Sequence, residues 1–378
     1  MFRSGSPVKG KEFIDRKKHL PIFKAYLDNN QHIMIKAPRR FGKTSLIKHI
    51  FEHEKRYEFI YIDVRLASSL DTLSNQILNK AYKIVKIDNF IQKAKGSLLE
   101  LLQSIKQIKV AGIAEISIDY ISKNSDSIEL FMHSLDVVEK IAKSKGINIK
   151  VIFNEFQDIT NLYDKNILET IRSVAQHHEN ITYVFLGSIE SIMSNIFESK
   201  SSPFFHFASV IQLTGLDIDE LFSYTLKAFD KQSIAYDKDA LYDTIFFLQG
   251  HPEYSSKVLQ TLYINAKIEN RTITYEDCIE AINFRIIENR AYLDEIISKA
   301  KLKKHHFEML YNIANNIKST LSSATVYNTN ISLENMGLIK KIEKGKYELV
   351  DIFLKILLQQ QDNEALAIDN RLNISLKK

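Results

Sequence analysis

The stretch IMIKAPRRFGKTSLI, residues 33–47, constrains the fold of this chain more than any other part of it. A short apolar run leads into a turn, and the turn ends in Gly-Lys-Thr at the start of a helical pattern. Gly42 lets the backbone curl so that successive N–H groups point at one anion, and the dipole of the following helix adds to the attraction. Lys43 offers a mobile positive charge for the outer phosphates of a nucleotide, and Thr44 offers a hydroxyl for Mg²⁺. The sequence therefore predicts a strand, a phosphate-binding loop and a helix in direct succession.

The loop departs from the pattern GxxxxGK[ST] at its first position, where Ala37 stands in place of glycine. Alanine fits there when its backbone angle φ is negative, so we expect the loop to keep its shape. Arg39 and Arg40 either face the phosphates or are simply solvated. The further residues of this stretch that we predict to contact the nucleotide are Pro38, Arg39, Arg40, Phe41 and Ser45.

A second hydrophobic strand, VIFNEFQ at 151–157, ends in polar residues. In a parallel sheet this end lies beside the phosphate-binding loop. Glu155 has the carboxylate that polarises an attacking water, whereas Asn154 can hold a metal-bound water but brings no charge. The alternative is a strand that ends in ordinary surface residues. We predict Glu155 and Lys43 as catalytic residues, and Thr44 and Asn154 as the residues that order Mg²⁺.

Two weaker motifs follow. YVFLGSIE, residues 183–190, ends a strand at Ser188, which either touches the γ-phosphate or caps the next helix. In LQGHPEYS, residues 248–255, Gly250 and Pro252 either pack on an adenine ring or simply start a helix.

Helical and strand patterns alternate up to about residue 212, which indicates an α/β fold with a parallel sheet covered by helices on both faces. Beyond that point helical patterns dominate, and the chain then reads as a helix followed by two short strands and a last helix. The predicted domains are a core with an N-terminal helix (1–212), a helical lid (213–298), a winged helix (299–360) and a loosely ordered tail (361–378). Within the core we expect helices over 10–29, 127–145, 164–179 and 189–198, and a strand or hairpin over 110–122.

Charge is distributed unevenly along the chain. The formal net charge of the 378 residues is +5, and residues 299–348 alone hold nine lysines and four glutamates. A lysine-rich region favours a nucleic-acid partner, because lysines near phosphates release condensed counterions. The alternative is a solvated surface or one that binds a protein.

The remaining composition excludes several classes of protein. The single cysteine, Cys278, rules out an internal disulfide framework and a cysteine-based zinc site. The first residues lack the apolar core of a signal peptide, and no apolar run approaches the roughly 20 residues that span a bilayer. We expect a cytoplasmic protein with no membrane partner.

In their order, these motifs resemble the archaeal-type ATPase family of the STAND branch of AAA+ P-loop NTPases. The motifs that carry the resemblance are FIDRKKHL, IMIKAPRRFGKTSLI, VIFNEFQDI, YVFLGSIESIM and the Gly-His-Pro before the winged helix, within about residues 10–358. The resemblance implies an ASCE-type sheet, a helical lid and a C-terminal winged helix. It also implies that Arg16 lies near the nucleotide base and that Gly250 and Pro252 face the adenine.

The sequence departs from that family at functional positions. Asn154 replaces the usual aspartate of the strand, and Phe207 stands where members commonly have an arginine. If that arginine senses the γ-phosphate, this chain lacks a cation that can be worth about 10³-fold or more in rate. Should a neighbouring subunit of an oligomer supply an arginine instead, Arg172 and Arg285 are the candidates.

We therefore expect an ATP-binding and Mg²⁺-binding P-loop NTPase that acts as a nucleotide-dependent switch and hydrolyses ATP slowly. The alternative is a nucleic-acid-binding or scaffold protein whose nucleotide site is degenerate.

Overall fold

The computed structural model describes most of the chain. It covers residues 2, 5–8, 10, 13–14, 16–86, 127–163, 166–360 and 376. The strand or hairpin predicted over 110–122 lies outside the described residues, and so does the predicted tail over 361–378 except for Leu376.

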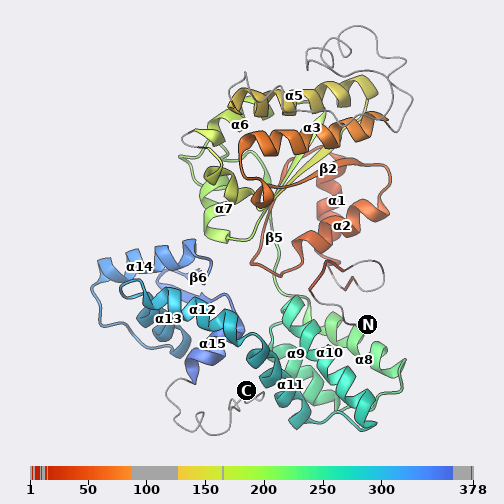
Figure 1. The fold of residues 1–378 in the computed structure, drawn as a ribbon. Helices are drawn as coiled ribbons and strands as arrows, with labels where there is room; N and C mark the ends of the chain where they lie inside the picture. Colours follow the sequence, from red (N-terminus) through yellow and green to blue (C-terminus); the bar gives the residue numbers. More distant parts are fainter. Residues whose placement is uncertain are drawn as a thin grey trace.

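Five parallel strands form the central sheet, in the order β2-β3-β4-β1-β5 (Figure 1). The strands are β1 (Ile33–Lys36), β2 (Glu58–Asp63), β3 (Ile149–Asn154), β4 (Ile181–Gly187) and β5 (Ser209–Gln212). Strands β3 and β4 are buried along their whole length, which explains their nearly continuous apolar sequences. One strand, β4, separates the strand before the phosphate-binding loop from the strand that precedes Glu155. This is the ASCE-type arrangement, and it confirms the predicted α/β core.

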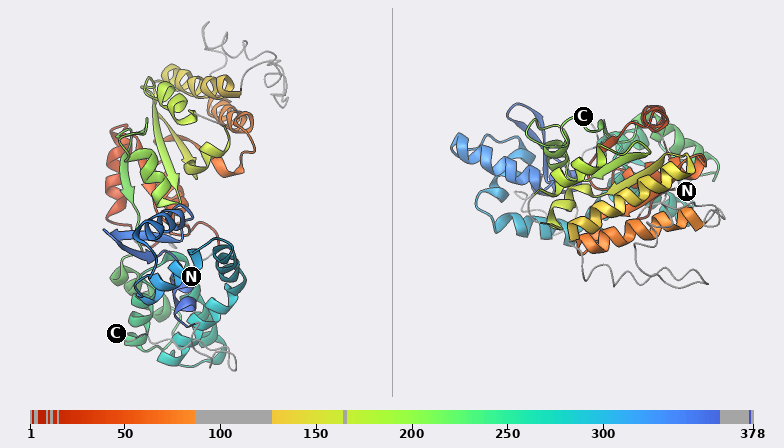
Figure 2. Two further views of the ribbon diagram at one scale, coloured as in Figure 1. Left: turned by 90° about the vertical axis from the view of Figure 1, so that its left-hand side faces the viewer. Right: turned by 90° about the horizontal axis from the view of Figure 1, so that it is seen from above.

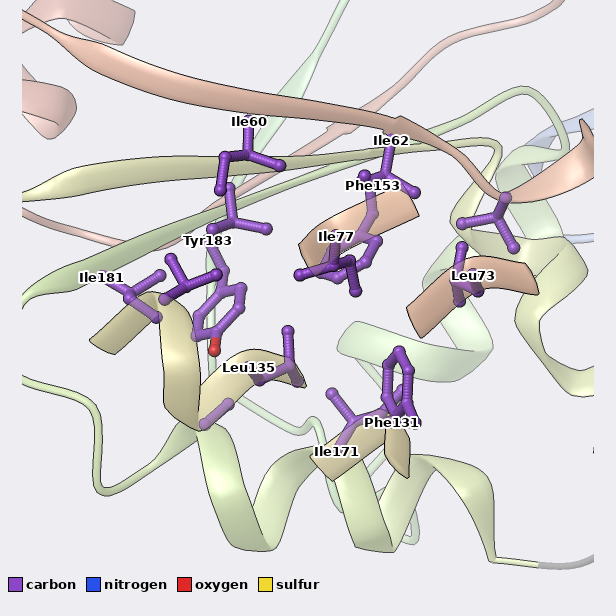
Figure 3. Packing of buried hydrophobic residues seen from close by; sticks show 14 of the residues in the cluster. Ile60, Ile62, Leu73, Ile77, Phe131, Leu135, Phe153, Ile171, Ile181 and Tyr183 are labelled. Carbon is purple, nitrogen blue, oxygen red and sulfur yellow. The ribbon is translucent and has the colours of Figure 1, made fainter. Parts of the chain in front are cut away.

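Helices cover both faces of the sheet (Figure 1). Along β1, Ile33 and Ile35 pack with the helices of one face, whereas Met34 belongs to the apolar core on the other face. The first face carries α1 (His19–Asp28) and α2 (Lys43–His53). The second carries α3 (Leu70–Lys86), α5 (Ser127–Lys145), α6 (Ile167–Ala175) and α7 (Glu190–Phe197). Figure 3 shows the apolar core on this second face, in which side chains from β2, β3 and β4 meet those of α3, α5 and α6.

The helix predicted over 10–29 is wrong in its first half. Helix α1 begins only at His19, because Arg16 has a φ of +74°, a left-handed conformation that a right-handed helix excludes. The other helices predicted in the core are present, and α5 has the predicted bounds of 127–145.

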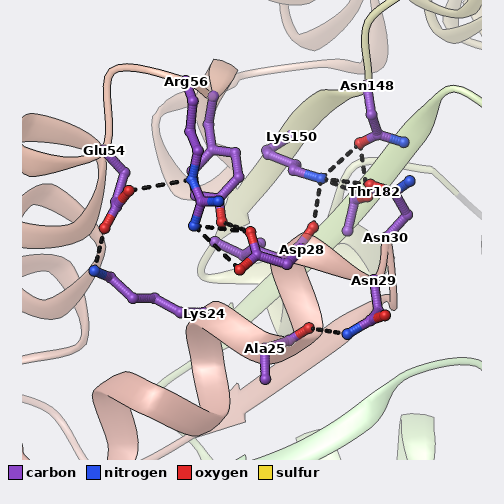
Figure 4. Close-up of polar contacts among 12 residues, drawn as sticks. Lys24, Ala25, Asp28, Asn29, Asn30, Glu54, Arg56, Asn148, Lys150 and Thr182 are labelled. Atoms are coloured by element: carbon purple, nitrogen blue, oxygen red, sulfur yellow. Dashed lines mark hydrogen bonds and ion pairs between the residues drawn. The ribbon is translucent and has the colours of Figure 1, made fainter.

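The amino-terminal edge of the sheet is held together by a buried lysine (Figure 4). The Lys150 ammonium donates to the Leu27 carbonyl (2.8 Å) and to oxygens of Asn30 (2.8 Å), Asn148 (2.9 Å) and Thr182 (3.2 Å). Burial lowers the pKa of Lys150 to about 8. These bonds join α1 to strands β3 and β4 at the edge opposite the phosphate-binding loop.

The C-terminal part of the chain is mostly helical and lies on the side of the core where the phosphate-binding loop is found (Figures 1 and 2). Its first helices are α8 (Ile218–Asp230), α9 (Lys238–Phe247), α10 (Pro252–Glu269), α11 (Tyr275–Glu288) and α12 (Arg290–Lys301). They are followed by α13 (His306–Asn315), α14 (Ser323–Asn335), the antiparallel pair β6 (Ile339–Glu343) and β7 (Lys346–Leu349), and α15 (Ile352–Gln359). This order is consistent with the predicted lid and winged helix.

One apolar core extends through this whole C-terminal part. It includes Leu221 of α8, Leu259 of α10, Leu310 of α13 and Phe353 of α15, so the predicted lid and winged helix pack against each other. Their boundaries at 212 and 298 stay predictions. No helix in the described part of the chain is long and apolar enough to cross a membrane.

Candidate nucleotide-binding site

The loop between β1 and α2 has the backbone that an anion-binding loop needs. Gly42, which precedes α2, has a φ of +83°, and Arg40 has a φ of +68°. Ala37 is not among the residues of positive φ, so alanine satisfies the backbone at that position. The first N–H groups of α2 have no carbonyl partners within the helix, and they therefore face the space beside the loop.

Lys43 is folded back onto its own loop. Its ammonium donates to the carbonyl oxygens of Ala37 (2.7 Å) and Pro38 (2.9 Å), and the residue is only 6% exposed. Burial lowers the pKa of Lys43 to about 8, although Glu155 favours the charged form. An anion bound in the loop would stabilise the ammonium and raise this pKa.

Glu155 is held in place by three neighbours at the carboxyl end of β3. Its carboxylate accepts hydrogen bonds from Gln157 (2.6 Å), Ser188 (2.5 Å) and Arg65 (3.2 Å). Burial opposes its charged form, but the bonds from Ser188 and Gln157 and the charges of Lys43 and Arg65 outweigh that effect and lower the pKa of Glu155. The carboxylate is therefore ionised at neutral pH and fixed in orientation.

Asn154 is paired with a carboxylate on the neighbouring strand. Asp63, the last residue of β2, is level with Asn154 in the sheet, and its Oδ2 accepts a hydrogen bond from the Asn154 amide (2.9 Å). Two residues earlier on β2, Tyr61 packs on the α2 side of the sheet and interacts with Thr44. The side chains of β2, β3 and α2 therefore meet at the carboxyl edge of the sheet.

These residues fit a Mg²⁺ ion bound together with a nucleotide. Thr44, Asn154 and Asp63 offer the hard oxygen donors that Mg²⁺ prefers. Among the described residues no group of three or more His, Cys, Asp or Glu side chains could hold a metal. The protein would thus supply only part of the coordination shell, as is usual for Mg²⁺, which keeps several waters and takes phosphate oxygens.

A cavity of about 430 Å³ opens between the loop and the helical region, a volume within the usual range for small-molecule sites. Nine predicted site residues line it: Arg16, Arg39, Arg40, Gly42, Lys43, Thr44, Ser45, Glu155 and Pro252. The helical region contributes Leu216, Glu253 and Ser256 as well, and the N-terminal segment contributes residues 5–8. The structure thus brings together residues from five separate stretches of the sequence.

Five predicted site residues do not line this cavity: Pro38, Phe41, Asn154, Ser188 and Gly250. The ring of Phe41 lies instead against His251 of the lid, with the ring centres 4.7 Å apart. Gly250 packs against Leu216, whose N–H donates to the Gly250 carbonyl (2.8 Å). Phe41 thus connects the loop and the lid, whereas Gly250 makes a contact within the lid. The contact of Phe41 with nucleotide and that of Gly250 with adenine stay predictions.

Arg16 joins the phosphate-binding loop to the start of the lid. Its guanidinium donates to the carbonyl oxygens of Phe41 (2.8 Å) and Thr214 (2.9 Å), and the residue is 2% exposed. It lines the cavity, and its place near the nucleotide base stays a prediction.

Phe207 lies at the opposite edge of the sheet from Lys43. It precedes β5 and packs against His32, which precedes β1, with the ring centres 4.5 Å apart. The Arg172 guanidinium lies over the Phe207 ring at 4.3 Å. An arginine at position 207 would not reach the phosphate-binding loop of its own chain, so its replacement by phenylalanine removes no cation from this site.

Three residues of the site, Asp63, Arg65 and Gln157, were not predicted from the sequence. Arg65 contacts Glu155 and also Asp158 (2.7 Å), and Gln157 contacts Glu155 and lies 3.4 Å from Ser188. The stretch YEFIYIDVR was recognisable as a strand ending in polar residues. The carboxyl ends of parallel strands share one edge of a sheet, which is why Glu155 was expected beside the loop. The same argument places Asp63 and Arg65, at the end of β2, on that edge.

Comparison with known proteins supports the fold. No family model matches the sequence, and no curated protein matches it. Among solved structures, the Walker-type ATPase paby2304 of Pyrococcus abyssi is similar to this chain with a TM-score of 0.69 and 14% identity, over 95% of this chain and 99% of that chain. The ORC2 protein of Aeropyrum pernix, solved as ADPNP–ADP complexes, is similar with a TM-score of 0.51 and 11% identity, over 93% and 95% of the two chains. The chain has the fold of an AAA+ P-loop NTPase.

Proposed function

We propose that this protein binds ATP and Mg²⁺ in the cavity beside the phosphate-binding loop, hydrolyses ATP slowly and acts as a nucleotide-dependent switch. The resemblance to the archaeal-type ATPases of the STAND branch supports this reading. So do the two similar structures, of which one is a Walker-type ATPase and the other was solved as ADPNP–ADP complexes.

The charge of the cavity carries the proposal. Among the residues that the structure describes, four cations line it, Arg16, Arg39, Arg40 and Lys43, against the two carboxylates Glu155 and Glu253. A negatively charged triphosphate matches this excess of positive charge. Its oxygens can accept hydrogen bonds from the loop N–H groups, from Lys43 and from exposed Arg39.

Glu155 is the residue suited to hydrolysis. Its ionised carboxylate lines the same cavity as Lys43 and Thr44, where it can orient a water toward the γ-phosphate. Its bonds to Arg65, Gln157 and Ser188 all fall on Oε2, which leaves Oε1 to accept a bond from water. We infer slow turnover, because these bonds and the charges of Lys43 and Arg65 lower the pKa of Glu155 and make it a weaker base toward that water.

Contacts between the loop and the C-terminal part support a switch. Arg40 lies 3.3 Å from Glu253 of α10, and its guanidinium lies over the ring of Tyr292 of α12 at 5.3 Å. A nucleotide that draws Arg40 toward phosphate competes with both contacts. Binding would thus bias the placement of the helices relative to the core.

A paired measurement on the full chain tests the proposal. In titrations of fluorescent ATP with Mg²⁺, Lys43→Ala should weaken affinity about 10- to 100-fold, the cost of losing a charge-assisted bond to phosphate. Glu155→Gln should keep the affinity and lower steady-state turnover about 10²- to 10⁴-fold. Lys48→Ala, on the same helix but away from the cavity, is the matched control. Unchanged affinity in Lys43→Ala would refute nucleotide binding through this loop.

The second candidate function is nucleic-acid binding through the lysine-rich residues 299–348. In a winged helix the helix before the wing enters the major groove, and here that helix is α14. It contains no Lys or Arg, and its Glu334 carbonyl accepts a bond from Ser191 of the core (2.9 Å). This candidate therefore ranks below the first. A mobility-shift titration at rising salt tests it, since phosphate contacts would make the affinity fall steeply with salt.

A further inference from the structure

We propose that Asp63 supplies the negative charge at the Mg²⁺ position that Asn154 cannot supply. The inference rests on the proposed function and names a further residue of its metal site. The carboxylate of this site would thus lie on β2, at the position paired with Asn154, instead of on β3.

The sheet register places the two side chains in equivalent positions. Asp63 and Asn154 are paired residues at the carboxyl ends of two hydrogen-bonded parallel strands, and their side chains are joined at 2.9 Å. Tyr61 lies on the same face of β2 as Asp63, because residues two apart on a strand share a face. Tyr61 packs with the helices α1 and α2 and interacts with Thr44, so this face of β2 lies against the first turn of α2.

The hydrogen bond also orients Asn154. Because the amide nitrogen donates to Asp63, the amide oxygen of Asn154 is turned away from Asp63 and is available as an acceptor or ligand. The Asp63 carboxylate is itself fixed, since its other oxygen accepts a bond from the Arg65 N–H (3.2 Å). Asp63 thus acts in two ways, by its charge and by the direction it gives to Asn154.

Asp63 is also accessible to a metal-bound water. It is only partly buried, whereas Asn154 is 7% exposed. A carboxylate in this position attracts the divalent ion through a bound water, and such outer-shell partners commonly contribute 10- to 100-fold to metal affinity. The charge at the carboxyl edge is thereby restored although the usual strand aspartate is absent.

The test measures how much Mg²⁺ strengthens ATP binding. The dissociation constant of fluorescent ATP is determined with Mg²⁺ and with EDTA for wild type, Asp63→Asn, Asn154→Asp and the exchange variant Asp63→Asn/Asn154→Asp. The gain is the factor by which Mg²⁺ lowers the dissociation constant of ATP. We expect this factor to be about 10- to 100-fold smaller in Asp63→Asn than in wild type. The exchange variant should recover the gain, because the pair is kept and only the charge changes strand.

Asp28→Asn is the charge-matched control. Asp28 contacts Arg56 (2.9 Å) at the amino-terminal edge of the sheet, so its replacement should leave the gain from Mg²⁺ unchanged. Thermal unfolding of every variant identifies any that do not fold. If Asp63→Asn alone is unstable, the exchange variant still tests whether the gain from Mg²⁺ depends on one carboxylate in the pair.

The outcomes separate this inference from the proposed function. If wild type binds no ATP with or without Mg²⁺, the proposed function fails. If wild type gains from Mg²⁺ and Asp63→Asn keeps the whole gain, only the role of Asp63 is refuted. A loss that the exchange variant does not recover would mean that Asp63 acts through local structure, and it would refute the role of its charge as well.

Discussion

At the scale of single residues, Gly250 packs the turn between α9 and α10 against the segment that precedes α8. It has a φ of +60°, and a Cβ on it would lie 2.2 Å from the backbone oxygen of Leu216. Both the conformation and the space therefore require glycine. The Gly-His-Pro motif is explained here by close approach of two backbone segments, and this role is independent of any contact with adenine.

We expect Gly250→Ala to destabilise the protein by about 3 kcal/mol or more, because overpacking adds about 1–3 kcal/mol to the strain of a left-handed alanine. Gly345→Ala is the matched control. Gly345 has a φ of +80° but nothing within 4 Å of its Cβ position, so it should lose only about 1–2 kcal/mol. Chemical denaturation measures both losses, and equal losses would contradict the close contact at Gly250.

At the scale of elements, helix α10 begins at a buried histidine beside the phosphate-binding loop. His251 is the N-cap, its Nδ1 accepts from the Tyr254 N–H (3.3 Å), and the residue is 7% exposed. Nδ1 can accept only when it carries no proton. Burial lowers the pKa of His251 to about 3, and the nearby charge of Arg40 adds to this effect.

The stability of the lid should therefore depend on pH. His251 binds a proton below about pH 6.5 in the unfolded chain but only near pH 3 in the folded protein. The contribution of neutral His251 to the free energy of unfolding is complete above pH 6.5 and is lost as the pH falls toward 3. At pH 5 the loss is about 2 kcal/mol. His251→Asn keeps a capping side chain without this titration. Unfolding of both proteins between about pH 7 and pH 5 should show a steeper loss in wild type, and parallel profiles would contradict the assignment.

At the scale of the whole molecule, a chain of aromatic rings runs from the phosphate-binding loop to the C-terminal helix. Phe41 contacts His251, His251 stacks on Tyr254 (4.2 Å), and Tyr254 stacks on Phe353 of α15 (3.9 Å). The Tyr254 hydroxyl also donates to Asp351 (2.6 Å), the N-cap of α15. Loop, lid and predicted winged helix are thus in continuous contact, which is the physical requirement for coupling between them.

Arg40 is the charged link in this arrangement, and its removal should loosen the loop from the helical region. We expect Arg40→Ala to increase hydrogen exchange of α12 in the nucleotide-free protein, since it loses its contacts with Glu253 and Tyr292. Glu253→Gln should have a smaller effect in the same direction. Arg290→Ala removes only an exposed ion pair with Asp294 and serves as control. Unchanged exchange in Arg40→Ala would argue against mechanical coupling through this residue.

The sequence alone determined the features that depend on neighbours along the chain. The loop around Lys43 is recognisable because its turn, its glycine and the helix after it are consecutive in the sequence. The alternation of apolar strands and amphipathic helices likewise determined the α/β class, since each pattern repeats within one element. Glu155 could be placed at the right edge because the carboxyl ends of parallel strands meet there.

Only the tertiary structure decided which side chains meet across strands. The contact of Asp63 with Asn154 and that of Arg65 with Glu155 depend on β2 lying next to β3, and no local pattern encodes that order. The same holds for Arg16, whose left-handed backbone interrupts a helical pattern because its guanidinium binds the loop and the lid. Contacts between distant segments are set by packing of the whole chain, whereas periodicity reports only the preference of each segment by itself.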